Sequence, residues 1–244
     1  MLHQTKDKLC TLKLTGMAQA LEEQLSQPEM NNLSFEERLG MLVDREWDVR
    51  ESRKLTRRLR FAKFKQQACV EDVDFRHPRG LDRSIFFSLA ECRWIKSCHN
   101  VIISGPTGVG KTFLACALGN KACRMGFNVL YFRMSRFLHA LLTARADGTY
   151  SSLVRKLQKT HLLILDDWGL TPIELEQARE LFDILEDRNQ LGSTLIVSQI
   201  PVSQWHEAIA DPTIADAILD RLVHNAYKLE LRGESMRKTM SKLD

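Results

Sequence analysis

The chain has 244 residues, of which 44% are apolar, enough for one large α/β domain or a smaller domain with an appendage. Its formal net charge of +4 is too small to identify a partner. The first ten residues lack the apolar segment of a signal peptide, and no apolar run approaches the roughly 18 residues of a membrane span. The six cysteines lack paired CxxC spacing, which is typical of reduced thiols. We therefore expect a cytoplasmic protein.

Residues 1–66 are predicted to form a small, all-helical N-terminal domain. Apolar residues recur at helical spacing from Leu9 to Leu25, and Pro28 ends that pattern. Ser34, followed by Glu37, is a capping box that should begin a helix extending toward Phe64. Residues 34–51 carry six acids and three bases, whereas residues 50–65 carry eight bases and one acid.

The basic end of this helix is the main candidate for DNA contact, because Lys and Arg neutralise phosphates without reading sequence. The alternative is a solvated helix face that pairs with the neighbouring acids. The bases are Arg50, Arg53, Lys54, Arg57, Arg58, Arg60, Lys63 and Lys65. A second cluster comprises Arg133, Arg136, Arg145, Arg155, Lys156 and Lys159. No base-reading motif is visible, so backbone contacts and DNA deformation are predicted.

Residues 67–244 are predicted to form an α/β domain with a five-stranded parallel sheet flanked by helices. Residues 67–99 form a connector that contains a short helix around Ile85–Ile95. Beyond it, strands alternate with helices, and this order is typical of a parallel sheet covered on both faces. The expected strands are residues 100–104, 128–132, 161–165, 193–197 and 227–231, and a helix is expected at 113–124.

A phosphate-binding loop follows the first of these strands. Residues 105–112 match GxxxxGK[ST] at every fixed position and lie between a strand and a helix. Glycines let successive backbone amides point inward, and the helix N-terminus adds partial positive charge. Lys111 should reach the β- and γ-phosphates of ATP, and Thr112 should help to hold Mg²⁺. The expected nucleotide contacts are Gly105, Pro106, Thr107, Gly108, Val109, Gly110, Lys111, Thr112 and Phe113.

Two acidic residues and a glutamine end the strands predicted beside this loop. Asp166 and Asp167 follow four apolar residues; Asp166 should hold Mg²⁺, and Asp167 should orient or deprotonate the attacking water. Gln199 follows the fourth strand and can lie between these acids and the γ-phosphate, although strand ends often carry ordinary polar residues.

Two arginines near the end of the chain are candidates for contacts with the γ-phosphate. Arg221 follows an apolar helical stretch and is typical of an arginine finger that reaches the nucleotide of a neighbouring subunit. Arg237 could contact the phosphates within its own subunit. For either residue, the alternative is a surface salt bridge.

With these motifs in place, the chain resembles the AAA+ initiator and loader clade, and within it the IstB family of ATP-binding transposition helpers. DnaC-type helicase loaders are a sister group. The resemblance spans nearly the whole chain. It rests on residues 105–112, the LLILDDWGL block at 162–170, Ser203-Gln204-Trp205, the segment 217–222 and GESMR at 233–237.

The resemblance implies an ATP-controlled homo-oligomer, a ring or a helix, that assembles on target DNA, deforms it and recruits or stimulates a transposase. Hydrolysis of ATP would reset the assembly. It also assigns Lys111, Thr112, Asp166 and Asp167 to the nucleotide site, Arg221 to a finger acting in trans, and Gln199 and Arg237 to two sensors.

The sequence departs from the family pattern at three points. Asp167 stands where many AAA+ proteins have Glu, so slow turnover is expected, and Gln199 stands where Asn or Thr is usual. Only seven residues follow Arg237, too few for a helical lid, so the connector or a neighbouring subunit should cover the adenine.

Three alternatives remain open at this point. A helicase loader would bind a replicative helicase through its N-terminal helices. A small-molecule P-loop kinase would have an acceptor pocket and act as a monomer. A DNA-binding module would hold ATP without turnover.

Overall fold

A computed structural model describes residues 2–236 of the chain. The chain divides into two compact units, residues 1–57 and 58–244. Among the described residues, no helix has both the length and the apolar character needed to cross a membrane.

The first unit is helical, as its sequence predicts. It contains α1 (Leu2–Thr11), α2 (Thr15–Ser26), a 3₁₀ segment (Pro28–Asn32) and most of α3 (Phe35–Ala62). The predicted capping box begins α3, because the Ser34 amide donates to Glu37 Oε2 at 2.8 Å and the Glu37 amide donates to Ser34 Oγ at 3.2 Å. Buried Glu46 of α3 accepts hydrogen bonds from the first turn of α2, at 2.7 Å from the Gly16 nitrogen.

The second unit begins inside α3 and not at residue 67, the boundary that the sequence suggests. The last residues of α3 and the segment after it belong to this unit because they pack on it: Ala62 is fully buried, and the Phe64 ring lies against Gly119. The connector then contains α4 (Arg83–Ala90) and α5 (Arg93–Lys96). These replace the single helix predicted around Ile85–Ile95, because Cys92 adopts a left-handed conformation with φ 59°.

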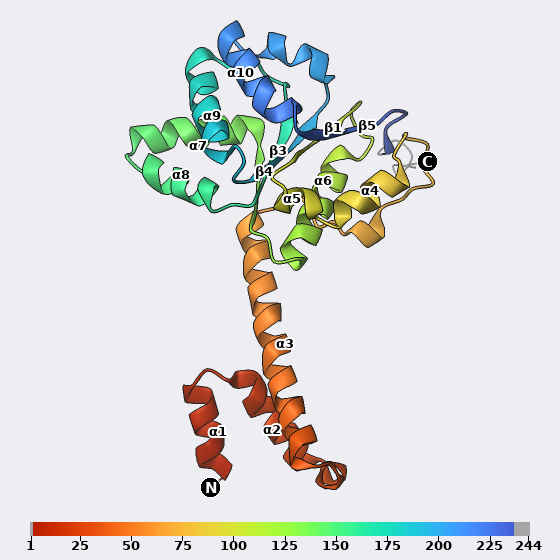
Figure 1. Cartoon of the computed structure of the whole chain (residues 1–244), viewed down its shortest axis with the longest axis vertical. Coiled ribbons are helices and arrows are strands. Elements are labelled where there is room, and N and C mark those ends of the chain that lie inside the picture. The colour runs from red at the N-terminus through yellow and green to blue at the C-terminus, as the bar shows by residue number, and fades with distance from the viewer. Residues whose placement is uncertain (1, 237–244) are drawn as a thin grey trace, which may run out of the picture. The chain divides into compact units, whose positions relative to one another are not determined.

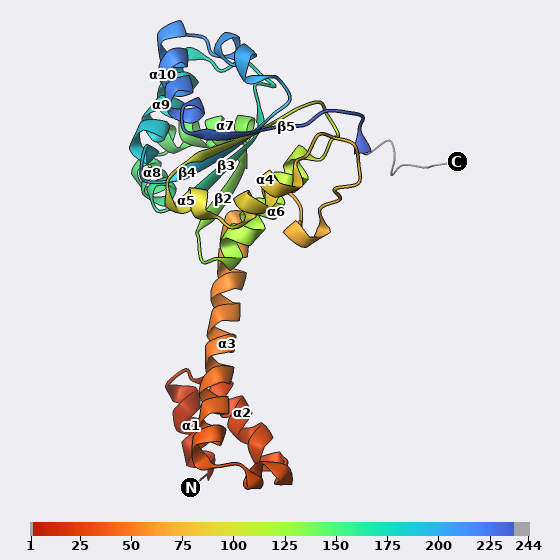
Figure 2. The ribbon, with the colours of Figure 1, turned by 45° about the vertical axis from the view of Figure 1, so that its right-hand side comes forward.

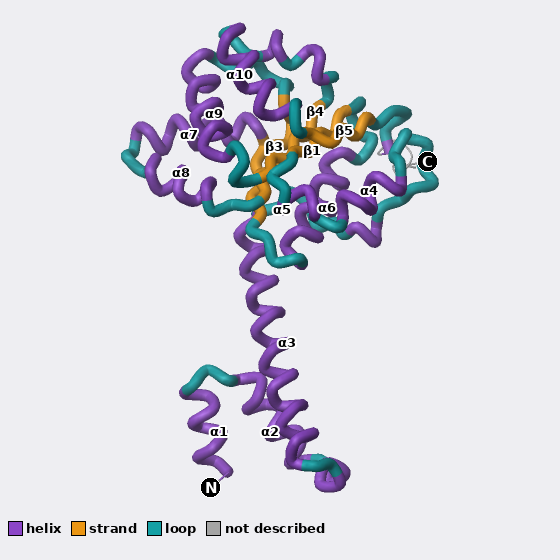
Figure 3. The backbone as a smooth tube through the Cα atoms, viewed as in Figure 1, coloured by secondary structure: helices purple, strands orange, loops and turns teal. Residues whose placement is uncertain are grey.

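Five parallel strands form the sheet of this unit in the order β2-β3-β4-β1-β5. Figure 3 shows the strands at the centre of the unit and the helices outside them. The strands are β1 (Asn100–Ser104), β2 (Val129–Arg133), β3 (Leu162–Trp168), β4 (Ser193–Ser198) and β5 (Ala226–Glu230). The predicted strands are confirmed to within one residue at their first positions.

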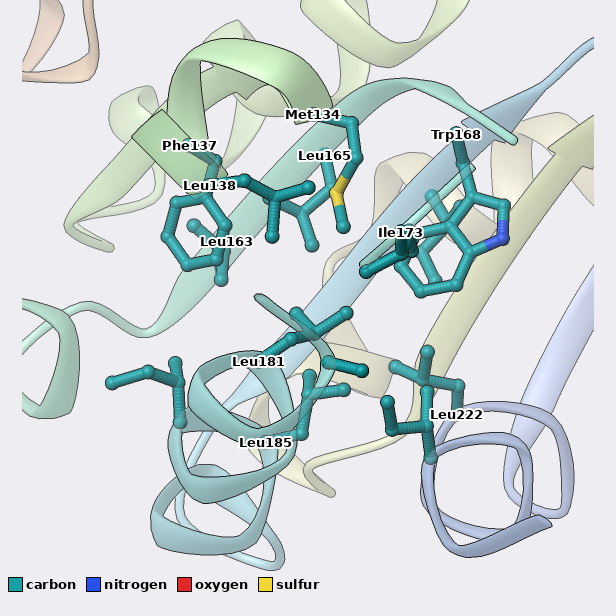
Figure 4. Packing of buried hydrophobic residues seen from close by; sticks show 14 of the residues in the cluster. Met134, Phe137, Leu138, Leu163, Leu165, Trp168, Ile173, Leu181, Leu185 and Leu222 are labelled. Atoms are coloured by element: carbon teal, nitrogen blue, oxygen red, sulfur yellow. The ribbon is translucent and has the colours of Figure 1, made fainter. Parts of the chain in front are cut away.

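Helices cover both faces of the sheet. They are α6 (Lys111–Arg124), α7 (Met134–Ala146), α8 (Tyr150–Gln158), α9 (Leu175–Arg188) and α10 (Pro212–Val223). In Figures 1 and 2, α4 and α6 lie on one face, and α7, α9 and α10 lie on the other. The buried side chains between the sheet and the second group include Phe137, Trp168 and Leu181, which belong to the cluster that Figure 4 shows. The doubly covered sheet places the carboxyl ends of β1, β3 and β4 at one edge.

Candidate functional site

The loop between β1 and α6 has a backbone that only glycine tolerates at two positions. Gly108 and Gly110 have φ values of 87° and 91°, in the left-handed region. A Cβ on Gly108 would lie 1.9 Å from Ser235 Oγ, and a Cβ on Gly110 would lie 2.4 Å from Arg79 Nη1. The positive φ disfavours any other residue at both positions, and an added Cβ would also force the Ser235 or Arg79 side chain to move. The loop leads into the N-terminus of α6, where unpaired amides and the helix dipole favour an anion.

The ammonium group of Lys111 lies within this loop. Lys111 is 7% exposed, and its Nζ donates to the carbonyl oxygens of Gly105 and Pro106, each at 2.7 Å. These acceptors are neutral, so a phosphate oxygen would be a stronger partner for the same ammonium group. The cation is thus held where the loop could wrap a phosphate.

Asp166, two residues before the end of β3, faces the first turn of α6. Its side chain is fully buried, and its Oδ2 accepts a hydrogen bond from Thr112 Oγ1 at 2.9 Å. A hydroxyl and a carboxylate are oxygen ligands of the kind that Mg²⁺ takes together with water and phosphate oxygens. The chemistry of this pair therefore fits Mg²⁺.

Two further side chains hold Asp166, and the sequence did not identify either in this role. Tyr131 of β2 donates its hydroxyl proton to Asp166 Oδ2 at 2.5 Å, and Lys65 Nζ lies 3.9 Å from the same oxygen. Burial and then this hydrogen bond raise the pKa of Tyr131, so the phenol remains a donor. The signal for Tyr131 in the sequence was one hydroxyl group among the apolar residues Val129, Leu130 and Phe132. Lys65 was expected to contact DNA, whereas its ammonium group is directed toward this buried carboxylate.

Asp167 has an unusual backbone conformation. Its φ is 64°, and the pairing of β3 with β4 is irregular between Leu165 and Trp168. Its amide donates to Asp166 Oδ1 at 2.9 Å, while its own carboxylate lies 3.8 Å from Arg133 Nε and is partly open to solvent. A left-handed aspartate costs about 1 kcal/mol or more, and such strain is typical of functional positions. The bulge separates the two carboxylates, so that one is buried and the other accessible.

Gln199 and the loop are in direct contact. Gln199 follows the last residue of β4, and its Oε1 accepts a hydrogen bond from Thr107 Oγ1 at 2.5 Å. Ser198, one residue earlier, accepts from Trp205 Nε1 at 3.2 Å, and the rings of Trp168 and Trp205 lie 5.1 Å apart. The DDWG and SQW segments of the sequence thus pack together beneath the site.

A comparison with known protein families decides the family of the chain. The model of the IstB-like ATP binding protein family matches residues 7–243. The chain belongs to this family. It is 55% identical over 236 residues to an insertion sequence ATP-binding protein of Sinorhizobium fredii, with 97% of this chain and 96% of the relative covered. It is 34% identical to the insertion sequence IS21 ATP-binding protein of Pseudomonas aeruginosa, with 97% and 89% covered.

Solved structures of low sequence identity share the fold of this IstB-like chain. The crystal structure of DnaI superposes with a TM-score of 0.56 at 24% identity, covering 68% of this chain and 91% of DnaI. AMPPCP-bound DnaA from Aquifex aeolicus gives a TM-score of 0.57 at 18% identity, with 73% and 54% covered. The predicted P-loop AAA+ fold is thereby confirmed, and ATP binding follows from the family.

Arg221 lies far from the phosphate loop of its own chain. Its backbone oxygen accepts a hydrogen bond from Asn100 Nδ2 at 2.9 Å, and Asn100 is the first residue of β1, whereas the loop follows the last. The length of β1 separates the two sites by roughly 15 Å. The Arg221 guanidinium forms an ion pair with Glu186, which raises the pKa of Arg221, and it lies 5.0 Å from the centre of the Phe182 ring. The Arg221 side chain is therefore kept away from the phosphate loop of its own chain.

Arg79 in the connector is a site residue that the sequence analysis missed. It is 1% exposed, and its Nη1 donates to the carbonyl oxygen of Val109 at 3.0 Å and lies 3.2 Å from Met236 Sδ. Its backbone oxygen accepts from the Arg232 amide at 2.9 Å, and burial lowers the pKa of Arg79. In sequence, the residue is one base between turn-forming residues. In the structure, it joins the connector, the loop and the chain's last described segment.

The remaining candidates are dispersed over the second unit and α3. Arg145 binds Glu180 Oε1 at 2.7 Å and stacks on Tyr150, so its cationic head is already engaged. Arg133 lies beside Asp167, while Arg136 is exposed on α7. Arg53 and Arg60 are exposed on α3. Arg237, the expected second sensor, lies outside the described residues.

Proposed function

We propose that this IstB-like chain hydrolyses ATP with Mg²⁺, and that the nucleotide controls an oligomer that binds DNA and assists a transposase. One observation carries the proposal: the Thr112 hydroxyl lies 2.9 Å from the buried Asp166 carboxylate, with the Lys111 ammonium in the adjoining loop. This arrangement supplies oxygen ligands for a metal and a cation for the phosphates in one place.

The chain's own residues suggest a division of labour. Lys111 and the loop amides would bind the β- and γ-phosphates, while Thr112 and Asp166 would hold the metal, which would neutralise developing charge on the phosphates. The partly exposed carboxylate of Asp167 would orient the water and accept its proton. Arg133, at 3.8 Å, would keep this carboxylate in position.

The relatives favour a role in transposition over helicase loading. Proteins 34–55% identical over nearly the whole chain are named for insertion sequences. The similarity to DnaI, by contrast, is at 24% identity and concerns the fold. DNA contact draws support from the exposed bases of α3 and from the need of such a helper to act at many target sequences.

Asp167→Asn tests the enzymatic part of the proposal. The amide keeps the shape of the side chain but cannot accept a proton, so the hydrolysis rate should fall by about 100-fold or more. Nucleotide affinity should change little, because Lys111 and Thr112 remain. The measurement is phosphate release with and without DNA, alongside fluorescence titration of a labelled ATP analogue.

Asp187→Asn is the matched control, because it neutralises an exposed carboxylate on α9. It should retain the wild-type rate. If the wild type hydrolyses ATP no faster than Asp167→Asn does, the chain is a nucleotide-holding module and the enzymatic proposal fails.

The DNA contact has its own test in the salt dependence of binding. A triple variant with glutamine at Arg53, Arg60 and Lys63 removes two exposed bases of α3 and the exposed base that directly follows it. Each phosphate contact contributes about 0.9 to the slope of log K against log salt concentration, so this slope should decrease by about 2 to 3. Fluorescence anisotropy with a labelled duplex, at several salt concentrations, measures it.

The matched control is a second triple variant, with glutamine at Arg136, Arg155 and Lys159. If this variant has a smaller slope of log K against log salt concentration and the first triple variant has the wild-type slope, the DNA-binding surface lies on the second unit. A slope that neither triple variant reduces would contradict contact through both clusters.

A further inference from the structure

One face of α3 in the first unit exposes large apolar side chains. Leu39, Val43 and Trp47 are 40%, 51% and 66% exposed, although buried Glu46, which lies beside them on the same helix, packs on α2. Surfaces of this kind mark interaction sites when the apolar residues are contiguous. Spacings of four residues place these three side chains next to one another on the helix.

Charged residues extend the same face in both directions. Together they form what we call the α3 seam, whose members follow one another at intervals of three or four residues and are all exposed. The seam consists of Glu36, Leu39, Val43, Trp47, Arg50, Lys54 and Arg57. This spacing is the heptad-like pattern through which two helices pack against each other.

The order of charge along the seam is complementary to its own reverse. Trp47 lies near the middle of the seam, and the other members form pairs at nearly equal distances on its two sides. These pairs are Val43 and Arg50 (four and three residues away), Leu39 and Lys54 (eight and seven), and Glu36 and Arg57 (eleven and ten). An antiparallel second copy of the seam would therefore place acid opposite base at both ends and Trp47 at the centre. The aliphatic stems of Arg50 and Lys54 would cover the partner's Val43 and Leu39.

We propose that two copies of this chain pair through their α3 seams, antiparallel and with two-fold symmetry about Trp47. Such an interface is isologous, so each favourable contact occurs twice. A second copy already carries the complementary order of acid and base. An unrelated protein would need a helix with the same order of charges, so the charge pattern favours a second copy. The pairing uses residues of the first unit and no part of the nucleotide site.

Contacts within the monomer decide which residues can be substituted safely. Arg50 Nε binds Glu46 Oε1 at 2.7 Å, and Glu46 in turn caps α2, so a change at Arg50 would disturb the unit itself. Lys54 Nζ binds Glu51 Oε1 at 2.7 Å. Within residues 2–236, the side chains of Glu36 and Arg57 form no hydrogen bond or ion pair. These two ends of the seam are the positions for a charge exchange.

The experiment exchanges these charges in the full-length chain. It uses nucleotide-free protein in EDTA without DNA, so that assembly through the ATP site does not contribute and a failure of the ATPase proposal would leave the result intact. Glu36→Lys alone and Arg57→Glu alone should each weaken self-association by about tenfold or more, because like charges then meet twice in each dimer. An equimolar mixture of the two variants should restore it, because both contacts then join opposite charges. Sedimentation velocity and fluorescence transfer between labelled variants measure the three dissociation constants.

Trp47→Ala is the second variant, and it should weaken pairing by about 100-fold, as expected for a central tryptophan in an interface. Leu191→Ala is its control, since Leu191 is 72% exposed in the second unit and lies outside the seam. Circular dichroism checks that each variant is folded. The proposal is overturned if wild-type protein stays monomeric at about 100 μM, or if the mixture associates no better than the single variants.

Discussion

Replacing Lys111 with alanine is expected to raise the dissociation constant for ATP with Mg²⁺ by at least about 100-fold. The Lys111 ammonium lies 2.7 Å from two loop carbonyl oxygens, in the loop proposed to wrap the phosphates. A hydrogen bond to a charged partner contributes about 1.5–3 kcal/mol, and about 1.4 kcal/mol corresponds to a tenfold change in affinity. Loss of contacts with two phosphates therefore predicts the stated effect. Calorimetric titration of purified protein is the measurement.

Lys121→Ala is the matched control, because Lys121 lies in the last turn of the same helix, away from the loop. Its affinity should equal that of the wild type. A thermal melt without nucleotide separates a binding defect from a folding defect, since alanine at position 111 also frees two loop carbonyls. Unchanged affinity in a folded Lys111→Ala protein would remove the foundation of the proposed function.

Replacing Arg221 with alanine is expected to lower the rate of DNA-stimulated ATP hydrolysis by about 1,000-fold, while nucleotide binding is retained. The reason is positional: Arg221 lies beside the amino end of β1 and the loop follows its carboxyl end. A guanidinium so placed can stabilise the transition state only in a neighbouring subunit. The pKa of Arg221 is raised by its hydrogen bond to Glu186, so it carries its charge at neutral pH.

Mixing variants tests the action in trans directly. Lys111→Ala keeps the finger but lacks the loop cation, and Arg221→Ala has the reverse defect. Their mixture should therefore recover part of the activity that neither has alone. Glu186→Gln is the control, because it releases the guanidinium without removing it and should hydrolyse ATP at the wild-type rate or faster. Full activity of Arg221→Ala alone would show that another group stabilises the transition state.

Most of the second unit could be predicted because its signals are local. Apolar runs followed by glycines or acids indicated β1 and β3, and the loop motif pointed to Lys111 and Thr112. The capping box likewise located the start of α3 at its observed residue. In each case, the sequence pattern and the structural element that it predicts lie within the same short segment of the chain.

The contributions that sequence analysis missed come from long-range packing. Arg79 is 30 residues from Val109, to which it donates, and Tyr131 is 35 residues from Asp166. Neither belongs to a motif, because the partner is set by the tertiary fold. Lys65 looked like one of a series of DNA-binding bases, but α3 ends at Ala62, and the chain beyond it turns Lys65 toward Asp166. The left-handed residue Cys92, which divides the connector helix, is equally invisible in hydrophobic periodicity.

The separation of Arg221 from the phosphate loop gives every subunit two unlike ends. If Arg221 serves the next subunit, successive copies must join head to tail, and the assembly acquires a direction. In an open chain of copies, the loop at one terminus meets no incoming arginine, so that single nucleotide persists while interior ones turn over. Closure into a circle would remove this protected terminus. The geometry of one side chain would thereby set where along a filament disassembly begins.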